Sequence, residues 1–323
     1  MKLIVSTHAK LLALDLDRHY QLANCRVLST GHHYGIALLP QNTGSKYAFL
    51  AKHNDRVLTR YEGGSNFVVS DSVKFAGHVG YVHQIAYVNG GIYIANTERN
   101  SVVFQGLSVD VYHEYHFYGK HDDFNHVNSV FPCGESVAVL LHNRGRAPSE
   151  IIVLDHARNR GFVPKKRIEL KHWGCHNVFF DAGHLYYNAS QDGRFVVVDL
   201  HSKRIVRTLR FPGHTKGLAA SDTLLIIGYS EHAVREARAS TKGYLAVVDR
   251  MSLDVLAIVD LNIEAPTGNV NEIRLLSPPD QAHVGRRCAA GMLESFSLAS
   301  RFPLHPHLMR WSRRLRRVKR VGS

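Results

Sequence analysis

Residues 176–209 have the sequence HNVFFDAGHLYYNASQDGRFVVVDLHSKRIVRTL. This stretch holds four short runs rich in β-branched and aromatic residues, which begin near His176, His184, Arg194 and Arg204. Gly, Asp, Asn and Ser separate the runs, and this alternation of short runs and turn residues is typical of antiparallel strands. The stretch therefore predicts one small four-stranded sheet.

The start of this stretch recurs along the chain as a short phrase: a polar residue, one spacer and an aliphatic residue that opens a strand. The copies begin at Tyr34, His83, Asn128, His176, Lys216 and Asn271. Subtracting successive numbers gives spacings of 49, 45, 48, 40 and 55 residues. A repeat of about 40–50 residues is the length of one propeller blade. The chain is thus predicted to be all-β.

The sixth copy, at Asn271, is followed by a single strand before the pattern stops at Ser277-Pro278-Pro279. Three strand-like runs without a phrase lie at the other end of the chain, at residues 2–5, 10–16 and 20–28. Pairing them with the strand after Asn271 would complete the sixth blade and leave no open sheet edge. We therefore expect a six-bladed β-propeller over residues 1–279 and a C-terminal extension over 280–323.

Composition narrows the setting of this 323-residue chain. No run of eighteen or more apolar residues occurs, so we expect no transmembrane segment. The four cysteines form no CxxC pair, which favours a reduced, cytoplasmic location. Residues 310–320 carry seven basic residues and no acid, a composition suited to an anionic membrane surface or a polyanion. A solubilising tail is the alternative.

The repeated phrase places polar residues around one mouth of the central channel. The phrase position holds Tyr34, His83, Asn128, His176, Lys216 and Asn271, and the position two residues earlier adds His32, His126 and His214. Residues two apart lie on the same face of a strand. Five histidines are thus predicted to converge: His32, His83, His126, His176 and His214.

Converging imidazoles suit a divalent transition metal such as Fe, Zn or Mn. Calcium is not expected, because it prefers oxygen ligands. Two alternatives stay open. The same ring, with Lys216 in it, suits an anionic organic ligand without metal, or it serves only to satisfy backbone groups and water at a narrow axis.

The turns between second and third strands open on the same rim and add polar groups. They include His8, His142 to Arg144, Ser190 to Asp192 and Ser230 to His232. The long link from Ser230 to Arg238 presents two arginines, which suit carboxylates and phosphates. We assign substrate binding to Tyr34, Asn128, Arg235, Arg238 and Asn271, and catalysis to Glu231, Glu272 and Lys216.

Several of these phrases together resemble those of uncharacterised bacterial propeller proteins associated with glycosyltransferase and polysaccharide genes. The phrases are His83-Gln84-Ile85, Asn96-Thr97-x-x-Asn100, His176-Asn177-Val178, Lys216-Gly217-Leu218 and Gly228-Tyr229-Ser230-Glu231 to Arg235-x-x-Arg238. The resemblance spans about residues 75–275. The architecture also looks like that of lactonase and strictosidine-synthase propellers, whose calcium is held by Asn, Asp and Glu. The histidine-rich ring departs from that pattern.

Two functions follow as hypotheses. The first is a metal-dependent enzyme acting on a small anionic or sugar-derived substrate. The second is a non-catalytic binding module for a glycan, an anionic ligand or a protein. The rim lacks a basic and aromatic stacking platform, so nucleic acid is not an expected partner.

Overall fold

The structure is a computed structural model that describes residues 1–40, 47–54, 57–64, 66–88, 90–108, 110–118, 123–157 and 159–280. The C-terminal extension and its basic run lie outside the described residues. Within them, no helix is long and apolar enough to cross a membrane. Cys25 and Cys175 are free thiols, whereas Cys133 is disulfide-bonded, which departs from the reduced cysteines expected from the sequence.

Twenty-four strands form six four-stranded antiparallel sheets in the described ranges. The first sheet in chain order contains β4(Ile36–Leu38), β5(Tyr47–Asn54), β6(Val57–Gly63) and β7(Phe67–Lys74). The second contains β8(Val82–Val88), β9(Gly91–Asn96), β10(Ser101–Gly106) and β11(Tyr112–His116). The third contains β12(Val127–Cys133), β13(Ser136–Leu141), β14(Glu150–Ala157) and β15(Gly161–Glu169). The fourth contains β16(Cys175–Asp181), β17(His184–Ala189), β18(Arg194–Asp199) and β19(Arg204–Arg210). The fifth contains β20(His214–Ala220), β21(Leu224–Ser230), β22(Gly243–Asp249) and β23(Val255–Asp260). The last sheet joins β24(Val270–Ser277) to β1(Lys2–Thr7), β2(Lys10–Leu16) and β3(Leu22–Thr30).

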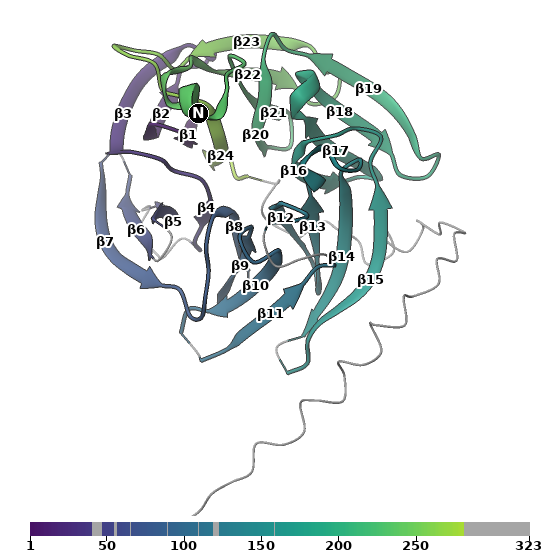
Figure 1. Cartoon of the computed structure of the whole chain (residues 1–323). Helices are drawn as coiled ribbons and strands as arrows, with labels where there is room; N and C mark the ends of the chain where they lie inside the picture. Colours follow the sequence, from purple (N-terminus) through teal and green to yellow (C-terminus); the bar gives the residue numbers. More distant parts are fainter. Residues whose placement is uncertain are drawn as a thin grey trace, which may run out of the picture.

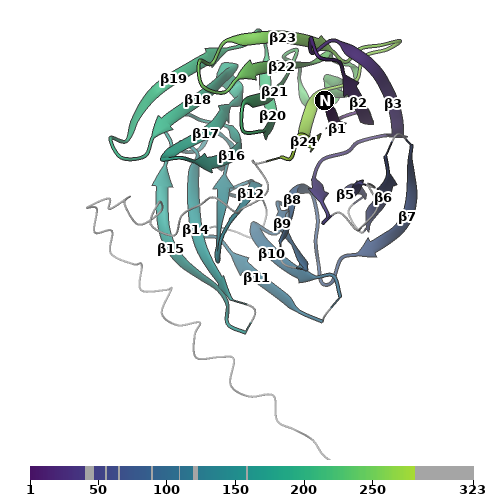
Figure 2. The same ribbon diagram turned by 180° about the vertical axis from the view of Figure 1, so that it is seen from behind.

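The six sheets stand around a central axis, as both views show (Figures 1 and 2). The innermost strands are β4, β8, β12, β16, β20 and β24, and each contacts the next around the ring, with β24 contacting β4. The predicted six-bladed β-propeller is therefore confirmed.

The ring is closed by strands from the two ends of the described chain. β1 pairs antiparallel with β24, with Leu3 opposite Leu275 and Val5 opposite Ile273. All four of these side chains are buried without exposed surface. The closure predicted for the sixth blade is thus confirmed, and it leaves no inner strand of that blade unpaired.

The middle residue of the repeated phrase ties one blade to the next at three junctions. Backbone N–H groups of the following blade donate to the Gln84, Ser129 and Asn177 side chains, from Val130 at 2.8 Å, Asn177 at 2.9 Å and Gly217 at 2.8 Å. Buried backbone groups need such partners.

A β-bulge accompanies the phrase in five inner strands, including β24, where Asn271 is left out between Val270 and Glu272. The register shifts between Val82 and Ile85 in β8, and between Thr215 and Leu218 in β20, with similar shifts in β12 and β16. A bulge turns a side chain away from strict alternation. Polar side chains of the phrase can therefore reach the axis while the rest of each strand stays in the core.

Three short 3-10 helices occupy the turns between second and third strands: η1(Asn143–Gly145), η2(Ser190–Asp192) and η3(Arg235–Ser240). The backbone N–H of Asn269 donates to the Arg238 carbonyl at 2.9 Å, which holds η3 against the start of β24. Gly268, with φ +77°, fits this contact because a Cβ there would lie 3.0 Å from the same carbonyl oxygen.

Candidate functional site

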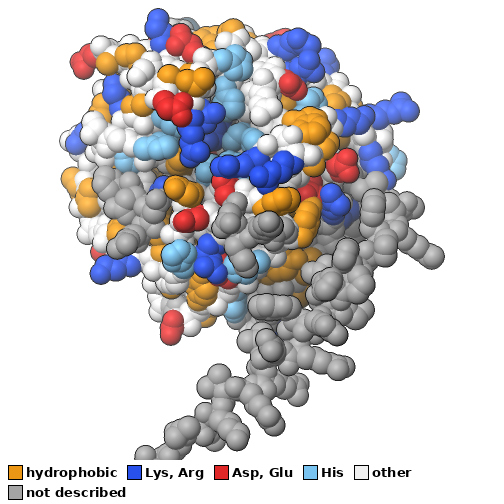
Figure 3. Space-filling model, viewed as in Figure 1, with side chains coloured by type: hydrophobic (Ala, Val, Ile, Leu, Met, Phe, Trp, Pro, Cys, Tyr) orange, Lys and Arg blue, Asp and Glu red, His pale blue; other side chains and the backbone are white. Residues whose placement is uncertain are grey.

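A pocket of about 590 Å³ opens at the mouth of the central channel. This volume is in the range of sites for small molecules. Lys, Arg and His side chains gather around the middle of this face (Figure 3). The lining residues are His8, Tyr34, His83, His126, His142, Arg144, His176, Gln191, His214, Lys216, His232, Ala233, Val234, Arg235, Arg238 and Asn269.

An arc of aromatic rings forms much of the wall. In order around the axis the rings are His214, His176, His142, His126, His83, Tyr34, His32 and His8. Neighbouring centroids lie 5.6, 5.2, 5.0, 4.7, 4.5, 4.5 and 4.2 Å apart. All six blades contribute a phrase or pre-phrase residue or a turn residue to this arc, so the repeat itself builds it.

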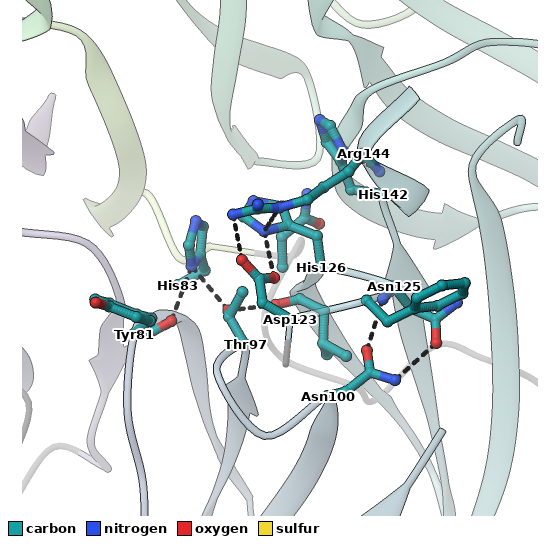
Figure 4. Close-up of polar contacts among 12 residues, drawn as sticks. Tyr81, His83, Thr97, Asn100, Asp123, Asn125, His126, His142 and Arg144 are labelled. Carbon is teal, nitrogen blue, oxygen red and sulfur yellow. Dashed lines mark hydrogen bonds and ion pairs between the residues drawn. The ribbon is translucent and has the colours of Figure 1, made fainter. Parts of the chain in front are cut away.

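The Nδ1 atoms of several rings are held by the protein, as Figure 4 shows for two of them. His83 Nδ1 lies 2.9 Å from the Tyr81 carbonyl, and His126 Nδ1 lies 2.7 Å from the Asp123 carboxylate. His8 Nδ1 lies 3.3 Å from the Asn269 carbonyl. Carbonyl and carboxylate oxygens only accept, so Nδ1 of these rings is assigned the hydrogen and Nε2 keeps its lone pair. At His126 the 2.7 Å contact with Asp123 decides this assignment over the longer, 3.4 Å contact of the same Nδ1 with Arg144 Nε.

His142 has the opposite arrangement. Its Nδ1 accepts the backbone N–H of Arg144 at 3.1 Å, so its hydrogen lies on Nε2. The pocket wall therefore offers both imidazole acceptors and at least one imidazole donor.

The histidines of the arc are neutral at pH 7. Burial, with the nearby Lys216 as the next cause, lowers the pKa of His8 to about 2, of His32 to about 4 and of His214 to about 3. Burial also holds the pKa of His83, His142 and His176 well below the usual value. The wall thus provides hydrogen-bonding groups without net charge.

Charge in the pocket comes instead from Arg144, Arg235 and Arg238 and from the ammonium form of Lys216. The Nζ of Lys216 donates to Asn271 Oδ1 at 3.2 Å and lies 4.6 Å from the centroid of the Tyr34 ring. Burial, followed by the neighbouring Arg238, lowers the Lys216 pKa to about 7. Arg144 forms an ion pair with Asp123 behind the wall (Figure 4).

No carboxylate is among the residues that line the pocket. The Nε of Arg238 is buried and has no hydrogen-bond partner among the described residues. A buried guanidinium N–H without a partner is costly, and an anion in the pocket would supply one.

The structure brings together eight of the thirteen residues predicted for the site. Four of the predicted metal ligands line the pocket, His83, His126, His176 and His214, together with Lys216, Tyr34, Arg235 and Arg238. His32 is exposed and packs at the edge of the arc, with its ring 4.2 Å from that of His8. It does not line the pocket.

Asn128 and Asn271, predicted to bind substrate, use their amides to join blades. Asn128 Nδ2 donates to the Cys175 carbonyl at 3.0 Å, and Asn271 Nδ2 donates to the His33 carbonyl at 2.7 Å. Both side chains are buried. Asn271 keeps one link to the site, through its Oδ1 contact with Lys216.

The two predicted carboxylate bases lie apart from the pocket lining. Glu231 is exposed, and its Oε2 accepts the backbone N–H of Lys242 at 3.0 Å. Glu272 is buried on the axis, where its Oε1 lies 2.5 Å from Arg274 Nη1 and accepts from Asn177 Nδ2 at 3.3 Å. Burial raises the pKa of Glu272.

Among the described residues, no three His, Cys, Asp or Glu side chains meet closely enough to hold a metal ion. The rings of the arc are spread along the wall rather than gathered at one point. Metal binding by His32, His83, His126, His176 and His214 stays a prediction that requires these rings to move together.

Six polar lining residues were absent from the predicted site: His8, His142, Arg144, Gln191, His232 and Asn269. Most belong to the rim turns that the sequence had placed at the same mouth. The signal that could have selected them was their position in turns between the second and third strands. Sequence alone gave no ranking among those turns.

No family model and no curated protein matches this chain. Among solved structures, it is similar to a chain in the nidogen/laminin complex and to a protein of unknown function from Bacteroides caccae. Their identities are 10% and 13%; each match has a TM-score of 0.59 and covers 84% of this chain and 97% of the other. At such identities the likeness shows the fold alone.

Proposed function

We propose that the axial pocket binds a small anionic ligand. The observation that carries this proposal is the pocket lining, which contains no carboxylate and holds Arg235 and Arg238 beside Lys216. Arg144 also lines the pocket but is paired with Asp123. Arginine reads carboxylate and phosphate groups through paired hydrogen bonds. The neutral histidines and Tyr34 supply donors and acceptors for hydroxyl groups, which suits an acidic sugar or a sugar phosphate.

Binding is tested by titration calorimetry with phosphate, citrate, glucuronate and, as a neutral comparison, glucose. In the Arg235→Ala/Arg238→Ala variant we expect affinity for the preferred anion to fall roughly tenfold or more, because a hydrogen bond to a charged group contributes about 1.5–3 kcal/mol. Arg207→Ala, an exposed arginine on β19, is the matched control. Equal affinities in the two variants, or glucose binding as well as the anions, would contradict the proposal.

A metal-dependent enzyme is the second candidate. The observation that favours it is the hydrogen bond from Nδ1 of His83 and of His126 to an acceptor, since such contacts orient histidines whose Nε2 binds a metal. In this candidate the anionic ligand is the substrate, and Lys216 is the one residue of the predicted catalytic set that lines the pocket. Glu272 is paired with Arg274, and Glu231 lies outside the pocket lining.

Elemental analysis of untagged protein tests this candidate, with His126→Ala and His176→Ala beside it. One equivalent of Fe, Zn or Mn that disappears in both variants would support it. Protein that stays free of metal after reconstitution would leave the pocket as an anion receptor.

The basic run at residues 310–320 suggests, as a separate proposal, a contact with an anionic membrane surface or a polyanion in the cytoplasm. Binding to anionic vesicles should weaken steeply with added salt and be lost when residues 281–323 are removed. Cell fractionation tests the cytoplasmic location. The expected link to polysaccharide genes also stays a prediction.

A further inference from the structure

Lys216 is a primary amine at the inner end of the pocket. It lines the cavity although only 8% of its surface is exposed. The bulge in β20 and the adjacent Gly217, with φ +86°, direct this side chain toward the axis. A Cβ at Gly217 would lie 2.9 Å from Ile273, so the bulge is closely packed from behind.

The pocket places the enclosed amine of Lys216 in one cavity with Arg235 and Arg238. Burial and Arg238 lower the pKa of Lys216, whereas Glu272 raises it, and the Tyr34 ring 4.6 Å from Nζ favours the ammonium ion. No salt bridge involves its Nζ among the described residues, and its hydrogen-bond partner is the neutral amide of Asn271. Arg238 adds a second positive charge nearby. A desolvated lysine beside another cation is the usual environment of an amine that attacks carbonyl carbon.

We propose that Lys216 forms a reversible Schiff base with a carbonyl group on the anionic ligand, which makes the substrate class a small 2-oxo acid or an aldehyde or ketone that bears an acid group. This inference rests on the proposed anion pocket, because Arg235 and Arg238 would hold the acid group while the amine meets the carbonyl. The described pocket has room for both ends of such a molecule.

The reaction balances without a further reagent. The lone pair of neutral Nζ attacks the carbonyl carbon and forms a C–N bond, while the carbonyl π electron pair moves to oxygen. One proton then passes from the nitrogen to that oxygen and gives the carbinolamine. The carbinolamine then loses its hydroxyl group and the remaining nitrogen proton as water, leaving a C=N bond. Hydrolysis reverses these steps, so nothing is oxidised or reduced.

The test is reductive trapping of the wild-type protein with pyruvate or glyoxylate and sodium cyanoborohydride, followed by peptide mass spectrometry. Cyanoborohydride delivers hydride to the imine carbon and fixes the adduct as a secondary amine. We expect one adduct, on the peptide that contains Lys216, at about tenfold or more above exposed Lys171, because a buried lysine keeps more neutral amine. Lys216→Arg should abolish it and Lys171→Arg should not.

Calorimetry with lactate, which has the same acid group as pyruvate but no carbonyl, separates the two proposals. Lactate binding without any Lys216 adduct from pyruvate would overturn the Schiff base and leave the anion pocket standing. A Lys216 adduct from neutral hydroxyacetone as strong as that from pyruvate, with no lactate binding, would overturn the anion pocket and leave the lysine chemistry. Labelling of Lys171 equal to that of Lys216 in wild-type protein would overturn the Schiff base even if the Lys216 variants fail to fold.

Discussion

At the residue scale, the buried histidines of the pocket link stability to pH. The pKa of His8 is lowered to about 2 and that of His214 to about 3, both below the usual 6.5. Above pH 6.5 each ring is neutral in the folded and the unfolded chain, so stability does not change with pH. Below pH 6.5 the unfolded chain binds protons that the folded protein does not, so the free energy of unfolding falls.

We therefore expect the wild-type protein to lose up to about 1.4 kcal/mol per histidine for each pH unit below 6.5. Urea unfolding at pH 7, 6 and 5 measures this slope. His8→Gln/His214→Gln should show a shallower slope, and exposed His201→Gln should keep the wild-type slope. An unchanged slope in the double variant would mean that these two rings are not held neutral.

The pair of Glu272 and Arg274 is a second feature at this scale, because both side chains are buried on the axis. Arg274→Met would leave a buried carboxylate without its main partner and should cost about 3–5 kcal/mol. Glu272→Gln/Arg274→Met should recover much of that loss. Lys2→Met, which breaks the half-exposed pair with Asp15, should cost no more than about 1 kcal/mol. Urea denaturation of the wild type and these three variants measures each loss of unfolding free energy. Equal losses in Arg274→Met and in Glu272→Gln/Arg274→Met would refute the pairing argument.

At the element scale, the position of η3 sets the position of Arg235 and Arg238. Gly268→Ala places a Cβ 3.0 Å from the Arg238 carbonyl, so we expect η3 to shift and anion affinity to fall severalfold. Gly134→Ala is the matched control, since it has the same left-handed backbone, φ +62°, and open space around its Cβ. Calorimetry on both variants tests this, and equal affinities would show that η3 does not position the arginines.

Elements also explain what the sequence could predict. The phrase recurs in all six blades, and in three of them Gln84, Ser129 and Asn177 bind the next blade. The blade count and the closure by β1 were therefore accessible from the repeat. The assumption that residues two apart lie on the same face of a strand failed in β12. The bulge between Val127 and Ser129 separates His126, which lines the pocket, from Asn128, which turns to the neighbouring blade.

The sequence did not show which rim turns place a side chain in the pocket wall. That depends on the tertiary contacts of each turn rather than on its residue types. His142 enters the wall because Asn143 is anchored below it, with Nδ2 donating to the Pro148 carbonyl at 2.9 Å. Glu231, from a turn of similar composition, stays outside because it binds the backbone of Lys242. Neither contact has a signature in the local sequence.

At the scale of the whole molecule, ring closure makes the last described residue important. The Asp280 carboxylate accepts the N–H of Ala220 at 3.3 Å through Oδ1 and that of Leu275 at 3.0 Å through Oδ2. It therefore links β20 to β24, and β24 carries the pairing with β1 that closes the ring. These contacts make Asp280 part of the propeller, whereas the sequence-based boundary placed it first in the C-terminal extension.

We expect a chain of residues 1–280 to unfold in one cooperative step close to the midpoint of the whole chain. Adding Asp280→Ala to it should lower the free energy of unfolding by about 1–3 kcal/mol, because two buried N–H groups lose their acceptor. Urea denaturation in reducing buffer makes the comparison, so that the disulfide of Cys133 does not differ between proteins. Asp254→Ala in the 1–280 chain is the control, because Asp254 is an exposed acid in a turn of the blade that contains β20. A 1–280 chain that fails to fold would place the boundary later, and equal effects of the two substitutions would show that Asp280 does not lock the ring.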